Sequence, residues 1–152
     1  MKYYYRITKY RNIDDYGNFH SSPDEWTGFF DVGDKVDIDE YRRVESQYID
    51  FILEACSFFS VSELKLKDVE LNSDVNYSEN QKIKVNRIED LVKSILREDI
   101  WCKLVSDSIE FHFGYDFYMY LLSKNNPECF IKKIKSPLTV HERKIISVRD
   151  IS

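Results

Sequence analysis

The side chains of this chain that could perform acid–base chemistry are three histidines and a dense group of carboxylates. His112 has the best setting, because Glu110 precedes it by two residues in a β-rich run and would share its face of a strand. A neighbouring carboxylate can orient an imidazole to act as a general base. The simpler interpretation is a half-exposed strand residue, and His20 and His141 make weaker candidates. The sequence therefore offers one hypothetical catalytic centre, between His112 and the turn that begins at Gly114.

The sequence signatures of well-known enzyme and cofactor sites are absent. The chain contains no HExxH, GxxxxGKS/T, GxGxxG or GxSxG pattern. Its three cysteines, Cys56, Cys102 and Cys129, are far apart and lack CxxC spacing, so neither a disulfide framework nor a zinc site is predicted. We therefore expect no catalytic residue, no metal ion and no cofactor, and we expect that the protein is not an enzyme.

An acidic segment, residues 14–40, carries nine acids but only one basic residue, Lys35. Nine negative charges and one positive charge give −8, whereas the whole chain carries −5, so the remaining residues sum to +3. A field of one sign attracts a basic partner and repels nucleic acid and anionic membranes. Trp26, Phe29 and Phe30 lie in this segment and are suited to anchoring a protein interface. The predicted partner-binding residues are Asp14, Asp15, Asp24, Glu25, Trp26, Phe29, Asp31 and Asp34.

The end of the acidic segment also has a structural explanation. Asp37, followed three residues later by Glu40, is a capping pair for a helix, and acids in a first turn suit the positive end of the helix dipole. Asp31, Asp34, Asp37 and Asp39 lie near each other but lack the central glycine and terminal glutamate of an EF-hand loop, so no calcium or magnesium site is predicted. The predicted docking surface therefore lies before Asp37.

Basic residues gather near the C-terminus but are partly offset by acids. The basic set is Lys124, Lys132, Lys133, Lys135, Arg143, Lys144 and Arg149, and the opposing acids are Glu128, Glu142 and Asp150. A nucleic-acid binder normally shows a dominant basic field, so these residues are interpreted as solvated faces. No apolar run is long enough to cross a bilayer, and no signal peptide opens the chain. We expect a cytoplasmic protein with neither a nucleic-acid nor a membrane partner.

Helical periodicity marks some of the elements that must position these residues. Apolar side chains recur at steps of three and four over residues 38–59, which predicts a long helix with one buried stripe. Residues 88–97 show the same pattern after a capping pair of Asn86 and Glu89. A short third helix is predicted to open with Pro127 in its first turn.

Alternating apolar residues predict strands around the helices. These strands cover residues 2–10, 64–71, 101–105, 109–113, 117–122 and 138–146, and a further short one lies around residues 26–30. Short turns between the three central runs imply antiparallel hairpins. The rest of residues 11–36 is predicted to form a long loop. The prediction is a single α+β domain over residues 1–152, an antiparallel sheet with two long helices and a short third helix.

Four stretches of aromatic and apolar residues together resemble a family of small acidic bacterial immunity proteins. They are residues 4–10 (YYRITKY), 24–33 (DEWTGFFDVG), 96–104 (LREDIWCKL) and 111–120 (FHFGYDFYMY), and the resemblance covers nearly the whole chain. Proteins of this family are encoded beside polymorphic or contact-dependent toxins and neutralise the cognate toxin domain in the producing cell. The family carries no catalytic residues to transfer to positions of this chain.

The resemblance implies a cytoplasmic, non-enzymatic inhibitor that binds one toxin domain tightly. Nuclease toxins are commonly basic because their substrate is polyanionic, so an acidic inhibitor can imitate that charge. Two alternatives stay open at this point. One is a small enzyme with its site near His112, and the other is a subunit of a larger assembly in which the same aromatic residues form a contact between copies.

Overall fold

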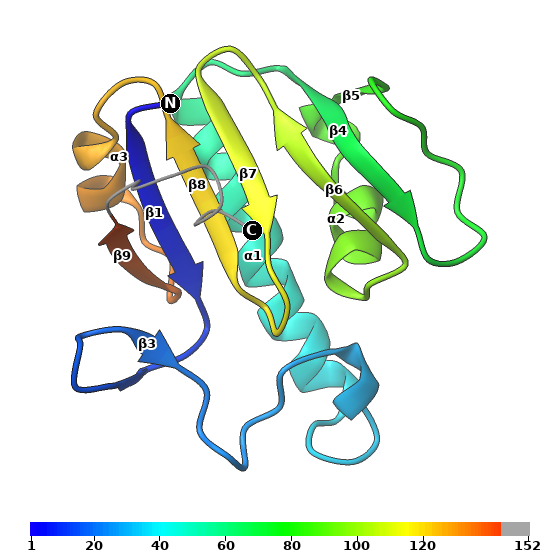
Figure 1. Ribbon diagram of the computed structural model, residues 1–152, viewed down its shortest axis with the longest axis vertical. Helices are drawn as coiled ribbons and strands as arrows, with labels where there is room; N and C mark the ends of the chain where they lie inside the picture. Colours follow the sequence, from blue (N-terminus) through cyan, green and yellow to red (C-terminus); the bar gives the residue numbers. More distant parts are fainter. Residues whose placement is uncertain (144–152) are drawn as a thin grey trace.

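The computed structural model describes residues 1–143, whose arrangement is shown in Figure 1. The strands are β1 (Tyr3–Thr8), β2 (Asn12–Ile13), β3 (Phe19–His20), β4 (Glu63–Leu71), β5 (Lys82–Lys84), β6 (Ile100–Val105), β7 (Ile109–Phe113), β8 (Met119–Ser123) and β9 (Thr139–Arg143). The helices are α1 (Ile38–Phe58), α2 (Glu89–Leu96) and α3 (Glu128–Lys133), and two 3-10 turns are η1 (Phe29–Asp31) and η2 (Val85–Arg87). The predicted α+β fold is confirmed.

Seven strands form one sheet in the order β5-β4-β6-β7-β8-β1-β9. Every neighbouring pair is antiparallel, and the predicted hairpins β6–β7 and β7–β8 are confirmed. The first strand lies inside the sheet, with Tyr5 opposite both Leu121 of β8 and Glu142 of β9. Because β1 is held on both sides, the chain that leaves it at Lys9 starts from a fixed position at one end of the sheet.

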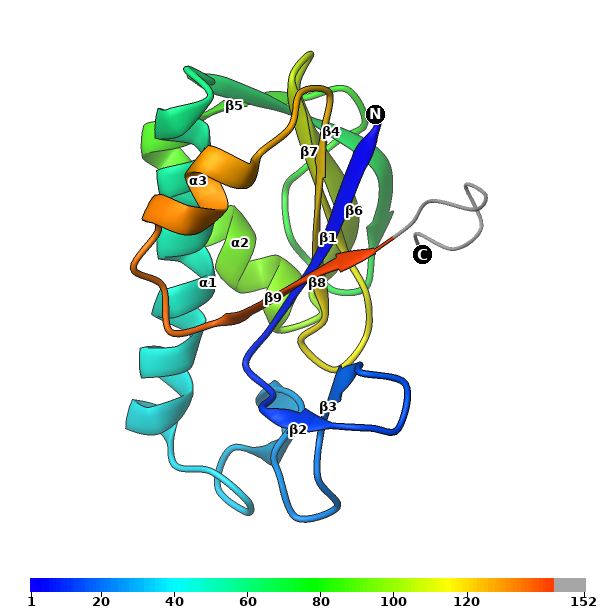
Figure 2. The ribbon, with the colours of Figure 1, turned by 90° about the vertical axis from the view of Figure 1, so that its left-hand side faces the viewer.

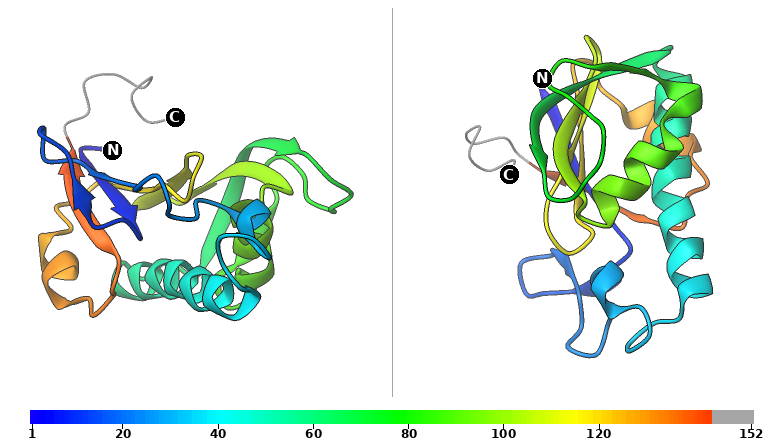
Figure 3. Two further views of the ribbon diagram at one scale, coloured as in Figure 1. Left: turned by 90° about the horizontal axis from the view of Figure 1, so that it is seen from below. Right: turned by 90° about the vertical axis from the view of Figure 1, so that its right-hand side faces the viewer.

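Helices cover one face of this sheet, as Figure 2 shows for α1, α2 and α3. The stripe predicted for the long helix is confirmed, and its buried members include Tyr41, Val44, Tyr48, Ile52 and Ala55. These side chains join one core cluster with alternate residues of the strands, such as Leu66, Leu104 and Phe111. The first turns of α1 extend past the strands, where they meet the acidic segment (Figure 3).

The two longer helices begin in different ways. The Asp37 side chain caps α1, because its Oδ1 accepts a hydrogen bond of 2.8 Å from the backbone N–H of Glu40. This confirms the first predicted capping pair. The second pair, Asn86 with Glu89, is wrong: η2 continues through Ile88, whose backbone is already helical, into α2, and no side chain caps that end.

Two further expectations are changed by the structure, and a third is confirmed in part. The short strand expected around residues 26–30 is replaced by η1, in which the N–H of Asp31 bonds the carbonyl of Gly28 at 3.1 Å. Phe117, expected in a strand, lies in the turn before β8 with a φ of 65°. The last strand is confirmed as far as Arg143, and residues 144–146 of that prediction lie outside the described residues, as do Lys144, Arg149 and Asp150.

Candidate functional site

The acidic segment closes one end of the molecule, below the β7–β8 turn in Figure 1. It begins at the β2–β3 hairpin, passes through η1 and reaches the first turn of α1. Seen from below in Figure 3, it lies across the end of the sheet and of α1. The predicted partner-binding residues are therefore gathered at one end of the fold.

Two of the candidate residues belong to the interior rather than to the surface. Trp26 is 9% exposed, and its ring lies 5.2 Å from that of Phe117 and 5.4 Å from that of Tyr41. Asp31 is 6% exposed, and its Oδ2 accepts a hydrogen bond of 2.8 Å from the backbone N–H of Thr27. The expectation that these two side chains meet a partner is corrected. Trp26 fastens the segment to the core, and Asp31 holds the chain around η1.

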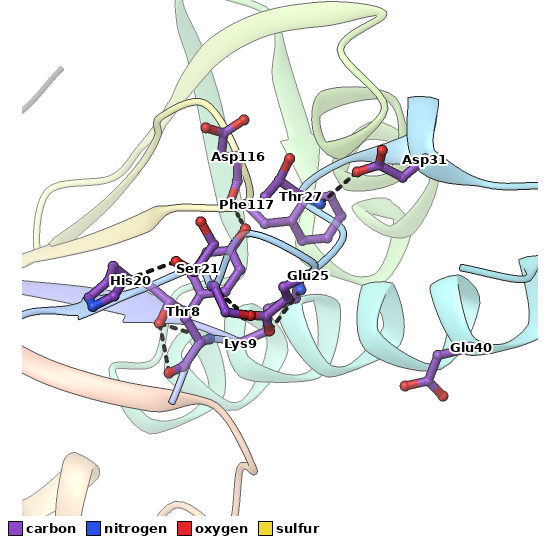
Figure 4. A network of polar contacts seen from close by, with 12 residues as sticks. Thr8, Lys9, His20, Ser21, Glu25, Thr27, Asp31, Glu40, Asp116 and Phe117 are labelled. Carbon is purple, nitrogen blue, oxygen red and sulfur yellow. Dashed lines mark hydrogen bonds and ion pairs between the residues drawn. The ribbon is translucent and has the colours of Figure 1, made fainter. Parts of the chain in front are cut away.

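Glu25 is engaged by a lysine of the same chain, as Figure 4 shows. The Nζ of Lys9 lies 3.3 Å from Glu25 Oε2 and 4.0 Å from the centre of the Trp26 ring. The other carboxylate oxygen accepts a hydrogen bond of 3.2 Å from the N–H of Ser22. Burial lowers the pKa of Lys9, and the carboxylate of Glu25 opposes that shift. Glu25 therefore contributes little unbalanced charge for a partner to meet.

A cleft of about 580 Å³ at this end opens between the acidic segment, α1 and the connection from α3 to β9. Its charged lining residues are three acids and three bases, namely Asp24, Glu25, Glu40, Lys9, Arg11 and Arg43. Two ion pairs already join members of this set, Lys9 with Glu25 and Arg43 with Glu40 at 2.6 Å. The cleft is therefore balanced in charge and does not select a cation over an anion.

The acidic field comes instead from carboxylates at the outer surface. Six exposed acids of the segment have no ion pair within residues 1–143, namely Asp14, Asp15, Asp24, Asp34, Asp37 and Asp39. Asp14 binds the N–H groups of Tyr16 and Asn18, which together lower its pKa, and Asp37 caps α1. The other four have no side-chain hydrogen bond in the described part of the chain. Asp39 lies in the first turn of α1, where its charge suits the positive end of the helix dipole. The charges of Asp15, Asp24 and Asp34 have no such structural role in these contacts.

Exposed aromatic side chains lie among these acids, and sequence reasoning missed the most exposed of them. Tyr16 at the tip of the β2–β3 hairpin is 88% exposed, and Phe30 in η1 is 68% exposed. Phe29 is only 37% exposed, because its ring packs on Tyr41 and lies below the guanidinium of Arg97. The turn pattern DYGN around Tyr16 was the available signal, since a residue at a turn tip has few neighbours to bury it.

His112, the candidate base, is 5% exposed. Its Nε2 lies 3.0 Å from Glu110 Oε1, so the two side chains are neighbours, as predicted. A concave site was expected around it, yet neither the 580 Å³ cleft nor the cavity beside Gly114 includes His112 in its lining. The enzyme alternative therefore lacks a base that a substrate could approach from either cavity.

Metal binding and thiol chemistry depend on the arrangement and protonation of the His, Cys, Asp and Glu side chains. Within residues 1–143, no group of three or more His, Cys, Asp or Glu side chains is arranged to hold a metal ion. Burial raises the pKa of the thiols of Cys56 and Cys102 to about 12, which leaves them protonated near neutral pH. Cys129 is exposed, on α3.

Comparisons with known proteins add no relative. No protein-family model, curated protein or solved structure matches this chain significantly. No helix in the described residues combines the length and the apolar character that crossing a membrane requires.

Proposed function

We propose that this protein is an immunity-type inhibitor that binds the toxin domain of a basic protein and thereby neutralises it. The binding surface is the acidic end, which we define as the carboxylates of Asp15, Asp24 and Asp34 with the rings of Tyr16 and Phe30. One observation carries the proposal: these three exposed acids have no ion pair in the described residues and lie in the same segment of the chain as two of the most exposed aromatic rings.

The physical steps follow from this arrangement. Unpaired carboxylates at one end of a molecule attract a cationic protein from a distance and orient it before contact. Tyr16 and Phe30 then supply apolar area that loses water when the surfaces meet. If the toxin is a nuclease, its active site is basic because it binds a polyanionic substrate. An acidic end that occupies this active site would prevent the substrate from binding.

The support has two parts, one from the residues and one from the fold. The four stretches that resemble immunity proteins lie in β1, in the acidic segment, from α2 to β6 and from β7 to β8. The C-terminal end of β1, the β7–β8 turn and the acidic segment lie together at one end of the fold. A charged surface held by an ordered frame loses little conformational entropy on binding, which favours a tight complex.

The test uses the protein encoded directly upstream of this chain's gene, whose last domain is the expected toxin. That domain is produced alone and mixed with this protein, and calorimetry measures stoichiometry and affinity. We expect a one-to-one complex whose association slows steeply as salt is added. We also expect this protein to restore growth of cells that express the domain. Absence of a complex with that domain, together with no rescue of growth, would overturn the proposal.

A further inference from the structure

A second cavity, of about 360 Å³, lies where β6 and β7 part. The ladder between these strands is formed only at Leu104 with Phe111 and at Val105 with Glu110. Beyond it the strands diverge, as Figure 1 shows. There the indole Nε1–H of Trp101 donates a hydrogen bond of 3.1 Å to the carbonyl oxygen of Phe113. A side chain thus replaces the missing backbone pairing and forms part of the wall of the opening.

The walls of this cavity combine aromatic rings with negative charge. Trp101, Phe113 and the exposed Tyr115 line it, and its charged lining residues are Glu70 and Glu98. No lysine or arginine of the described chain lines it, in contrast to the larger cleft with its three acids and three bases. Within residues 1–143, neither glutamate has an ion pair. The cavity is therefore chemically suited to a cation with an apolar or planar body.

Glu98 occupies a position where its residue type works against stability. It follows the end of α2 with a φ of 65°, and the N–H of Asp99 after it bonds the carbonyl of Ser94 at 2.9 Å. This geometry usually has glycine at the left-handed position, because other residues are strained there. A carboxylate at the C-terminal end of a helix also faces the negative pole of the dipole. Local stability therefore does not explain a glutamate here.

The cavity adjoins the acidic segment at Thr27 and Gly28. Thr27 and Gly28 of the acidic segment line a small cavity together with Glu98 and Gly114, both of which also line the 360 Å³ cavity. A protein that covers the acidic end can therefore extend a side chain past Gly28 into the opening between β6 and β7.

We propose that this cavity binds the guanidinium group of an arginine from the basic protein partner. The planar guanidinium can stack on the indole of Trp101 while its N–H groups donate to the carboxylates of Glu70 and Glu98. A lysine ammonium would pair with the acids but would not stack as a plane. This inference rests on the proposed function for the identity of the partner, and it assigns to that partner an arginine anchor.

The test uses two small probes and the two tryptophans of the chain. N-acetyl-arginine amide carries the guanidinium, and N-acetyl-citrulline amide has the same shape without the charge. The indole N–H resonances of Trp101 and Trp26 are followed in the nitrogen-labelled full chain. We expect the arginine probe to shift the Trp101 resonance in a saturable manner and to leave that of buried Trp26 unchanged. Equal shifts from citrulline, or no saturable shift of Trp101, would overturn the proposal.

Variants at the glutamates supply the second arm. We expect Glu98→Gln to weaken binding of the arginine probe roughly tenfold, as the loss of one charge-assisted contact implies. Glu54→Gln removes a carboxylate on α1 that is absent from the cavity lining, and it should bind the probe as wild type does. We also expect Glu98→Gly to melt at a higher temperature than wild type while losing affinity for the probe. Unchanged affinity in Glu98→Gln would overturn the assignment.

The outcomes separate this inference from the proposed function. A saturable Trp101 shift in a protein that binds no basic protein would overturn the proposed function and keep the guanidinium site. A toxin domain that binds wild type and Glu98→Gln equally would overturn the arginine anchor and keep the proposed function. A Trp101 resonance that changes with protein concentration alone would show that a second copy of this chain occupies the cavity, and would likewise overturn the anchor.

Discussion

The hydroxyl group of Tyr48 donates a hydrogen bond of 2.6 Å to the carbonyl oxygen of Phe117. The same hydroxyl oxygen accepts a hydrogen bond of 2.8 Å from the backbone N–H of Lys9. One buried side chain of α1 therefore joins the exit of β1 to the β7–β8 turn. Because the ring of Phe117 also packs on Trp26, this junction supports the acidic segment from beneath.

Replacing Tyr48 by phenylalanine would leave two backbone groups in the interior without a partner. Each such group costs about 1–3 kcal/mol, so we expect Tyr48→Phe to lower the free energy of unfolding by about 2–6 kcal/mol. Urea unfolding followed by circular dichroism measures this change. Tyr16→Phe is the matched control, because Tyr16 is exposed, and it should stay within about 0.5 kcal/mol of wild type. Equal stability of both variants would contradict the role given to Tyr48.

The ion pair between Glu45 and Arg97 joins α1 to the end of α2. Nε and Nη2 of Arg97 each donate a hydrogen bond of 3.0 Å to a carboxylate oxygen of Glu45, which is buried. Arg97→Met leaves that carboxylate without a cation, so we expect a loss of about 3 kcal/mol in the free energy of unfolding, at the low end for buried pairs because Arg97 is partly exposed.

The double variant Glu45→Met with Arg97→Met supplies the control for that pair. It removes both charges, and we expect it to be more stable than Arg97→Met alone. Chemical unfolding of the four members of this double-mutant cycle gives the coupling free energy. A double variant less stable than either single variant would show that packing, not the unpaired carboxylate, accounts for the loss.

The buried tyrosines predict alkaline unfolding. Burial raises the pKa of Tyr10, Tyr41 and Tyr48 above the ordinary value of 10.0. Above that value the unfolded tyrosines lose protons that the native ones keep, so the native state binds more protons and the free energy of unfolding falls as pH rises. Lys9, whose pKa is lowered, acts in the opposite direction only below its ordinary value of 10.5.

The measurement for this pH dependence is a titration of tyrosinate absorbance together with circular dichroism. We expect part of the tyrosinate signal to appear only when the circular dichroism of the fold is lost. Ionisation of all eleven tyrosines while the fold is intact would contradict the burial of these three hydroxyl groups.

Charge removal at the acidic end tests the proposed docking surface. We expect the triple variant Asp15→Asn, Asp24→Asn, Asp34→Asn to bind the toxin domain with an association rate about tenfold or more below wild type at low salt. The difference should shrink as salt is added, because screening removes the attraction from wild type as well. Stopped-flow mixing at several salt concentrations measures these rates.

The control for that variant removes the same charge elsewhere. Asp50, Asp74 and Asp107 are exposed acids outside the acidic segment, and their replacement by asparagine should change the association rate far less. Equal rates for the two triple variants would show that net charge alone attracts the partner and that the acidic end is not the docking surface. Both variants should unfold at the same urea concentration as wild type, since none of the six acids has an ion pair in residues 1–143.

Local patterns in the sequence were sufficient for the longer elements of the fold, but not for the short strands β2, β3 and β5. The stripe and cap of α1 follow from spacing and from Asp37, because both depend on residues within a few positions of each other. Alternation was likewise sufficient for β4, β6 and β7. The local pattern wrongly predicted that Asn86 caps the second helix. The 3-10 turn η2 runs directly into α2, so the backbone is already helical where a cap was expected.

The candidate site was less predictable, because burial there depends on distant residues. The acidic and aromatic residues around Trp26 and Asp31 predicted a protein interface. Contacts of these two side chains with Phe117, Tyr41 and Thr27 instead bury them in the fold. The cavity beside Trp101 arises from the divergence of two strands, which no local pattern describes. The positive φ of Glu98 after α2 is likewise visible only in the structure, because many helices are followed by residues other than glycine.

Burial of Trp26 and Asp31 has a consequence for the rate and strength of binding. A segment that is already ordered loses no further conformational entropy when it meets another protein, whereas a free loop loses about 0.5–1.5 kcal/mol for each side chain that it fixes. Two residues that are buried in the fold can therefore strengthen a complex by removing the need to order the segment during association. On this view, affinity would be sensitive to substitutions inside the fold as well as to those on its surface.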